Sequence, residues 1–123
     1  MTMEVYDQAY ALARSLRNSE SFKRLLQAEA VLIEEPTKWA QLQDVRHKQL
    51  EITAQQMAGK SIPQEKIDAL DNMMNALLID EQIRNYLLAE ERFAQLLADV
   101  QKIIGEVVKD LKLLTENPEK DRA

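Results

Sequence analysis

Cysteine is absent from this 123-residue chain, and glycine and proline are scarce, with two and three residues respectively. The lack of cysteine excludes disulfides, thiolate nucleophiles and cysteine-ligated zinc or iron–sulfur clusters. The scarcity of glycine and proline leaves few positions at which a helix must end. The dominant residues are alanine, leucine, glutamine, glutamate and lysine, which are strong helix formers. The composition therefore predicts an all-α protein with long helices.

Long apolar runs and an excess of positive charge are also missing. No apolar stretch approaches the ~18 residues of a membrane span, and the first ten residues lack the basic and apolar regions of a signal peptide. The formal net charge is −5, and binding to nucleic acid normally requires a basic stripe. The nearest approach to such a stripe is interrupted by Glu20 and consists of Arg14, Arg17, Lys23 and Arg24. We therefore expect a cytoplasmic protein with no direct nucleic-acid or membrane contact.

Apolar residues recur with the helical period in five segments, which we expect to be helices. Thr2 can cap the first helix, and Ser19 or Ser21 can cap the second. Pro36 ends the second helix, because the residue before a proline avoids the α region. The third helix is then expected from about residue 37 to residue 58.

A glycine–lysine–serine triplet at positions 59–61 resembles the end of a nucleotide-binding P-loop. A P-loop has another glycine five positions before the glycine of this triplet, where this chain has Ala54. A P-loop also follows a buried strand. A corner between two helices accounts for the same residues. The glycine would end the third helix in a left-handed conformation, and Ser61 with Gln64 would form a capping box for the fourth. Pro63 would be tolerated in the first turn of that helix.

The last segment carries the strongest pattern. Asp80 can cap a final helix from about Glu81 to Leu114, although the fourth and fifth helices could be continuous. Nine of its ten heptad a and d positions are apolar, which is typical of a coiled coil. Glu90, the one charged residue in this seam, either fixes the register or lies at its rim, paired with Arg84, Arg92 or a residue of another helix. The ten positions are Ile83, Tyr86, Glu90, Phe93, Leu97, Val100, Ile104, Val107, Leu111 and Leu114.

The length of this final helix predicts a dimer. Residues 81–114 would span ~50 Å as one helix, whereas a compact domain of this size has a radius of gyration of only ~14 Å. We therefore expect an all-α, antiparallel bundle of four to five helices with a long C-terminal helix, dimeric, over residues 1–115. Residues 116–123 are expected to form a disordered tail. The expected dimer-interface residues are Phe93, Leu97, Val100, Ile104, Val107 and Leu111.

Residues that could carry chemistry are few and scattered. Asp44 and His47 have the spacing of a helical metal-ligand pair, but di-iron bundles need two such motifs and this chain has one histidine. The carboxylates of Glu34-Glu35 and of Glu90-Glu91 are adjacent in sequence and therefore diverge on a helix. We expect no catalytic residue, no cofactor and no metal ligand. Four further residues could line a partner groove or pack in the core: Trp39, Met57, Met73 and Met74.

Three stretches resemble the YlbF/YmcA-like family of small helical bacterial proteins, and within it the YheA-like branch. They are "VYDQAYALARSLRNSESFKRL", "QQMAGKSIPQEKID" and "YLLAEERFAQLLADVQKIIGEVV", so the resemblance spans about residues 4 to 114. It implies an all-α dimeric bundle from a Gram-positive-type bacterium. Relatives are described as non-catalytic partners in complexes affecting RNA processing, competence, sporulation and biofilm formation. Some relatives carry cysteines tied to iron–sulfur clusters, a property that this cysteine-free chain does not share.

These observations favour a non-enzymatic adaptor or regulator that acts through an unidentified protein partner. A small-molecule or metal-binding helical bundle is the alternative, and a direct RNA binder is a third hypothesis. The lack of converging polar residues favours the first, and the acidic charge disfavours the third.

Overall fold

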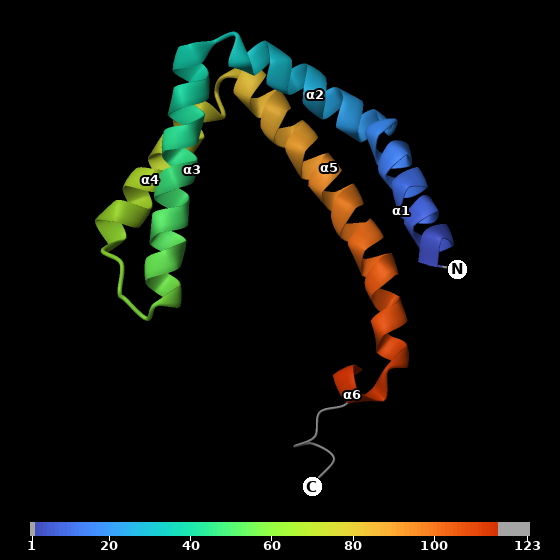
Figure 1. Cartoon of the computed structure of the whole chain (residues 1–123). Helices are drawn as coiled ribbons and strands as arrows, with labels where there is room; N and C mark the ends of the chain where they lie inside the picture. Colours follow the sequence, from blue (N-terminus) through green and yellow to red (C-terminus); the bar gives the residue numbers. More distant parts are fainter. Residues whose placement is uncertain (1, 116–123) are drawn as a thin grey trace, which may run out of the picture.

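The computed structural model describes residues 2–115, and the side chains of residues 2–113 (Figure 1). The described residues contain no strand, so the prediction of an all-α fold is confirmed. The predicted tail at 116–123 lies outside the described residues. The elements are α1 (Thr2–Arg17), α2 (Glu20–Ile33), α3 (Pro36–Met57), α4 (Gln64–Leu77), α5 (Glu81–Gly105), the 3₁₀ helix η1 (Glu106–Asp110) and α6 (Lys112–Thr115).

The helices form two arms that diverge from a common apex (Figure 1). One arm is the antiparallel hairpin of α3 and α4. In the other, α2 packs along the N-terminal half of α5, and α1 continues away from the apex in the direction of the far end of α5. The predicted antiparallel helix pairs are therefore present, but they splay apart instead of closing into one bundle.

The hydrophobic core is small and lies where the two arms meet. It joins α2, α3, α4 and α5, and Trp39, Met73 and Met74 pack against it. The Trp39 ring meets the Tyr86 ring edge-on, with 5.9 Å between their centroids. Of the four residues that could have lined a groove, Met57 alone is strongly exposed. The six buried core residues are Leu32, Leu42, Val45, Leu77, Ile83 and Tyr86.

Two of the predicted helix caps are present. The Ser19 hydroxyl accepts a hydrogen bond from the Phe22 amide at 3.3 Å and begins α2. The Asp80 carboxylate accepts one from the Ile83 amide at 3.1 Å and begins α5. Because Asp80 is extended and caps α5, α4 and α5 are separate helices. Thr2, predicted as a cap, is already the first residue of α1.

Gly59 ends α3 as predicted, with a φ of +79°. The amide of Gly59 donates to the Gln56 carbonyl and that of Lys60 to the Gln55 carbonyl, each at 3.0 Å. These two bonds form a Schellman motif, in which a left-handed residue satisfies the last helical carbonyls. The triplet at 59–61 is therefore part of a corner between two helices.

The predicted capping box of Ser61 and Gln64 is wrong. Pro63 occupies the cap position of α4, and no side chain caps this helix. The side-chain amide of Gln64 instead donates to the Asp68 carboxylate at 3.0 Å. Pro63 fixes its own φ and pushes the preceding residue, Ile62, out of the α region. Ile62 therefore cannot be the first helical residue that a Ser61 cap requires, and Ser61 lies outside the first turn of α4, which begins at Gln64.

The final helix is also shorter than predicted. It ends at Gly105 after 25 residues, or about 37 Å, and the chain continues into η1 and α6. Glycine favours the helix less than other residues except proline, so the last turn is easily lost there. The ~50 Å length from which a dimer was predicted is thus not present in this chain, although the exposed apolar residues remain.

The two glycines provide a matched pair of stability tests. Gly59→Ala should lower the free energy of unfolding by ~1 kcal/mol, because alanine is strained at positive φ. Gly105 is helical and has no atom near an added Cβ, so Gly105→Ala should be neutral or stabilise by up to ~1 kcal/mol. Urea unfolding at one fixed chain concentration measures both. Equal stability of wild type and Gly59→Ala would contradict the left-handed corner.

Candidate protein-interaction surface

A polar cluster joins the two arms at the apex. Arg46 of α3 donates to Glu90 of α5, with 2.5 Å between Nη2 and Oε1. The Arg46 guanidinium carbon also lies 5.5 Å from the centre of the Tyr86 ring. Of the two alternatives for Glu90, the structure supports the rim position, with its partner on another helix.

The cluster perturbs two of its members. Burial raises the pKa of the Tyr86 hydroxyl, and the neighbouring Glu90 raises it further, while Arg46 opposes the change. Burial alone would lower the pKa of Arg46, but the hydrogen bond and charge of Glu90 outweigh it, so the pKa is raised. Arg46 is therefore held in its charged form, and its hydrogen bond to Glu90 links α3 to α5.

A second ion pair reinforces the apex. Lys38 of α3 contacts the Asp80 carboxylate at 2.8 Å and donates to the Gln82 side chain at 2.9 Å. The hydrogen bond from Lys38, together with that from the Ile83 amide, lowers the pKa of Asp80. Asp80 thus caps α5 and anchors it to α3 at the same time.

The exposed fraction of apolar side chains increases with distance from the apex. Among the predicted interface residues, Phe93, Leu97 and Val100 are half-buried within this chain. Those beyond them are exposed: Ile104, Val107 and Leu111. The first half of α1 is exposed in the same way, through Met3, Val5, Tyr6 and Tyr10.

The chain has a larger surface area than a compact monomer of the same mass. The chain exposes 10032 Å², whereas a compact monomer of its mass would expose roughly 6,800 Å². Monomeric proteins rarely leave large apolar patches in water, and such patches commonly mark interaction sites. The distal half of α5, with α1 and η1, is therefore the candidate interaction surface.

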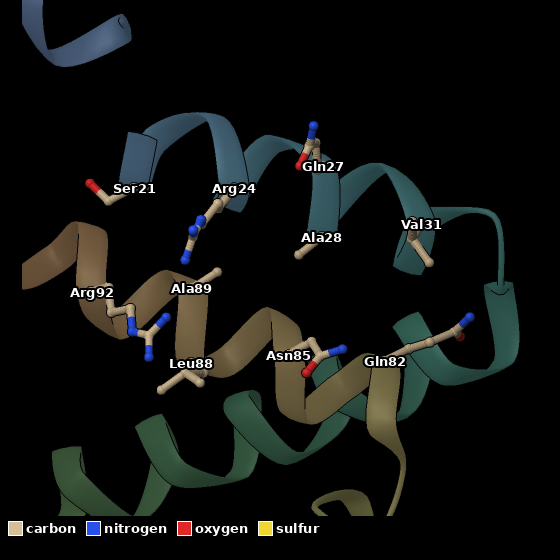
Figure 2. A pocket seen from close by; sticks show the side chains of 10 residues that line it. All are labelled: Ser21, Arg24, Gln27, Ala28, Val31, Gln82, Asn85, Leu88, Ala89 and Arg92. Atoms are coloured by element: carbon tan, nitrogen blue, oxygen red, sulfur yellow. The ribbon is translucent and has the colours of Figure 1, made fainter. Parts of the chain in front are cut away.

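A groove between α2 and α5 lies on the arm that bears this surface (Figure 2). Its volume is about 390 Å³. Arg24 reaches into it from α2 and Arg92 from α5, and Ala28 and Ala89 lie between the two helices. None of the residues that line it carries a carboxylate, although the chain as a whole is acidic.

The sequence candidates for chemistry do not converge. His47 is exposed and contacts Glu51 at 3.0 Å, while Asp44 pairs with Lys48 at 3.2 Å. In the described part of the chain, no three acidic or histidine side chains are grouped as metal ligands would be. The nearest approach to a basic stripe, around Arg24, is interrupted by Glu20, as the sequence indicated, because these two residues form an ion pair.

Sequence reasoning missed Lys38 and Arg46, which hold the arms together. Their charge alone did not distinguish them from other surface lysines and arginines. The available signal was position: Arg46 follows the core residue Val45 on α3, and seam position Glu90 needed a cationic partner.

Within residues 2–115, no helix has both the length and the apolar character needed to cross a bilayer. The fold and the surface together define a small, two-armed, all-helical protein with an exposed apolar face and no converging polar site among its described residues.

Comparison with known proteins identifies the family. The chain belongs to the YlbF/YmcA family, whose model, described as control of competence regulator ComK, matches residues 5–109. The chain is 38% identical over 104 residues to a UPF0342 protein of Symbiobacterium thermophilum, covering 85% of this chain and 93% of that one. It is 33% identical over 119 residues to a UPF0342 protein of Bacillus licheniformis, covering 97% and 99%. The resemblance noted in the sequence is thus confirmed.

A solved structure supports the fold. A protein of unknown function (DUF964) from Bacillus stearothermophilus matches with a TM-score of 0.75 over 88% of this chain and 95% of that chain. At 24% sequence identity, this likeness shows the shared helical architecture and carries no functional assignment.

The ion pair of Asp80 predicts a specific pH dependence. Because the folded-state pKa is lowered from 3.8, the pair stabilises the protein above that pH and the effect is lost as the pH falls through the lowered value. Asp80→Asn keeps a good cap but removes the charge. Its urea midpoint should lie below that of wild type at pH 7, and the two should converge only as the pH falls through the lowered folded-state pKa of Asp80. Asp80→Ala also loses the cap and should stay less stable throughout.

A double-mutant cycle measures the link between the arms. Arg46→Gln, Glu90→Gln and the double variant should give a coupling energy of about 1 kcal/mol, since the pair is partly buried. The exposed pair of Arg24 and Glu20 on α2 is the control, and its coupling should not exceed about 0.5 kcal/mol. Equal couplings would mean that the apex pair does not hold the arms.

Proposed function

We propose that this protein is a non-enzymatic, cytoplasmic regulator that acts through protein–protein contacts and works as a homodimer. The observation that carries the proposal is the distribution of apolar residues. Six buried residues at the apex form the whole described core, while large apolar side chains on α1, α5 and η1 face solvent. Such a chain gains stability and a defined shape by binding another protein.

Membership of the family supports a regulatory role, since its description refers to control of a competence regulator. We infer that this chain acts as an adaptor, which binds a second protein without changing it chemically. The inference agrees with the scattered placement of Asp44, His47 and the paired glutamates, which do not converge on one point.

The groove between α2 and α5 is our candidate site for an unidentified protein partner. Its volume of about 390 Å³ also falls within the range of small-molecule sites, which is the observation favouring the alternative of a ligand-binding bundle. Ligand sites, however, are mostly enclosed and apolar, whereas this one lies open between two helices and has two arginines at its edges. Those features suit side chains of a protein segment better.

The homodimer is tested with a single substitution. Ile104 is 56% exposed in the single chain, so Ile104→Asp should cost a monomer little. If a second chain buries it, an unpaired carboxylate should weaken association by several kcal/mol. Ala98→Asp, which adds the same charge on an exposed position turned away from the seam, is the matched control.

Sedimentation equilibrium at tens of micromolar is the measurement. Wild type and Ala98→Asp should give twice the chain mass of 14.2 kDa, and Ile104→Asp should give a lower average mass. A wild-type mass of one chain at that concentration would rule out the homodimer.

A further inference from the structure

The groove between α2 and α5 differs in chemistry from one end to the other. At the end away from the apex it is lined by Ser21 and by the two arginines, Arg24 and Arg92. Near the apex its lining is uncharged and includes Val31 of α2 and Gln82 of α5 (Figure 2). A ligand that matches the groove therefore carries negative charge at one end only.

The shape of the groove matches a helix. Its lining residues run from Ser21 to Val31 on α2 and from Gln82 to Arg92 on α5. Each stripe rises about 15 Å along its helix axis, which is close to three helical turns. A trough of this length between two neighbouring helices is the form of site into which an amphipathic helix binds through one apolar face.

The side chains along the groove permit such close packing. Ala28 and Ala89, which lie between the two helices, are too short to keep an approaching backbone away (Figure 2). Val31 and Leu88 are 48% and 44% exposed, so an apolar partner side chain would bury surface that now faces water.

Both arginines are available to a carboxylate from outside. Arg92 has no hydrogen-bond or ion-pair partner among the described residues. Arg24 pairs with Glu20 at 2.5 Å, but the two side chains are 56% and 77% exposed. Because exposed ion pairs contribute little stability, an incoming carboxylate can replace Glu20 at small cost.

The groove suits the carboxylates of a protein better than the phosphates of RNA. Tight binding to nucleic acid uses many cations along the phosphate backbone, whereas two line this groove. Single-stranded nucleic acid also stacks its bases on aromatic side chains, and the lining has none. An arginine, by contrast, binds one carboxylate through two parallel hydrogen bonds.

We infer that the groove binds an amphipathic helix of another protein, which has glutamates or aspartates at the end that meets Arg24 and Arg92. Apolar side chains of the same helix would cover Val31 and Leu88. The inference rests on the proposed function, in which the groove is the site for a protein partner, and it specifies the chemistry of that partner.

Synthetic helices test the inference directly. The probe is an alanine-rich peptide of about 18 residues, long enough to be partly helical alone, with leucines at i, i+4 and i+7 and three glutamates at one end. Two sister peptides carry glutamine or lysine in place of glutamate. In an NMR titration of the isotope-labelled full chain, the glutamate peptide should shift the amide signals of Ser21, Arg24, Ala28, Ala89 and Arg92. The glutamine peptide should bind several-fold more weakly, and the lysine peptide more weakly still.

Charge variants of the protein provide the matched comparison. Arg92→Gln should weaken binding of the glutamate peptide about two- to five-fold and leave binding of the glutamine peptide unchanged. Arg14→Gln is the control, because it removes the same charge from an exposed position on α1 outside the groove, and it should change neither. Glu20→Gln removes the carboxylate that competes for Arg24 and should strengthen binding of the glutamate peptide. Circular dichroism verifies that each variant keeps its helices.

The other outcomes contradict the inference in distinguishable ways. Equal binding of all three peptides would overturn the acidic partner and leave the groove as a protein-binding site. The same shifts at Ala28 and Ala89 with inorganic phosphate alone, or with a short single-stranded RNA, would overturn a protein helix as the occupant. No shift in the groove with any peptide at millimolar concentration, or shifts confined to the distal half of α5, would overturn both the inference and the groove as a partner site. The homodimer is tested separately, by sedimentation.

Discussion

The packing of four helices around six buried residues at the apex is the constraint on which the rest of the structure depends. Each fully buried aliphatic side chain there stabilises the fold by about 1.5–3 kcal/mol, and none of the arms has a comparable cluster of its own. The ion pairs of Arg46 with Glu90 and Lys38 with Asp80 add direction to this packing. They select which faces of α3 and α5 turn toward each other, which the non-directional hydrophobic contacts alone would leave open.

Because the core is confined to one end, stability must fall along each arm. Regions with few buried apolar contacts open locally at low free-energy cost. The α3–α4 corner and the end of α5 are such regions, since their side chains are exposed. A protein that binds these parts would contribute burial where the single chain has least. Binding at these parts would therefore also raise the free energy of unfolding, because a molecule that binds only the folded state stabilises it.

Local structure was predictable from sequence, and relative placement was not. Ser19, Asp80 and Gly59 act through bonds to residues a few positions away, so their roles could be inferred from spacing. The predicted Ser61 cap was wrong because serine and glutamine have the spacing of a capping box, while Pro63 keeps the intervening residue Ile62 out of the helix. The end of α5 was missed because the apolar heptads continue past Gly105 and hide the break. The partner of Glu90 lies 44 residues away in sequence, and no local pattern encodes that distance.

The net charge of the chain bears on how its exposed apolar side chains meet other molecules. With a formal charge of −5, copies repel one another weakly at long range, which opposes indiscriminate association. That repulsion is small compared with the burial available to two surfaces that match in shape. A surface that does not fit around the exposed side chains of Ile103 and Ile104 buries little apolar area, so its gain does not offset the repulsion. If another protein binds this face, the charge repulsion and the need for a close fit would together favour a complementary partner over an unmatched one.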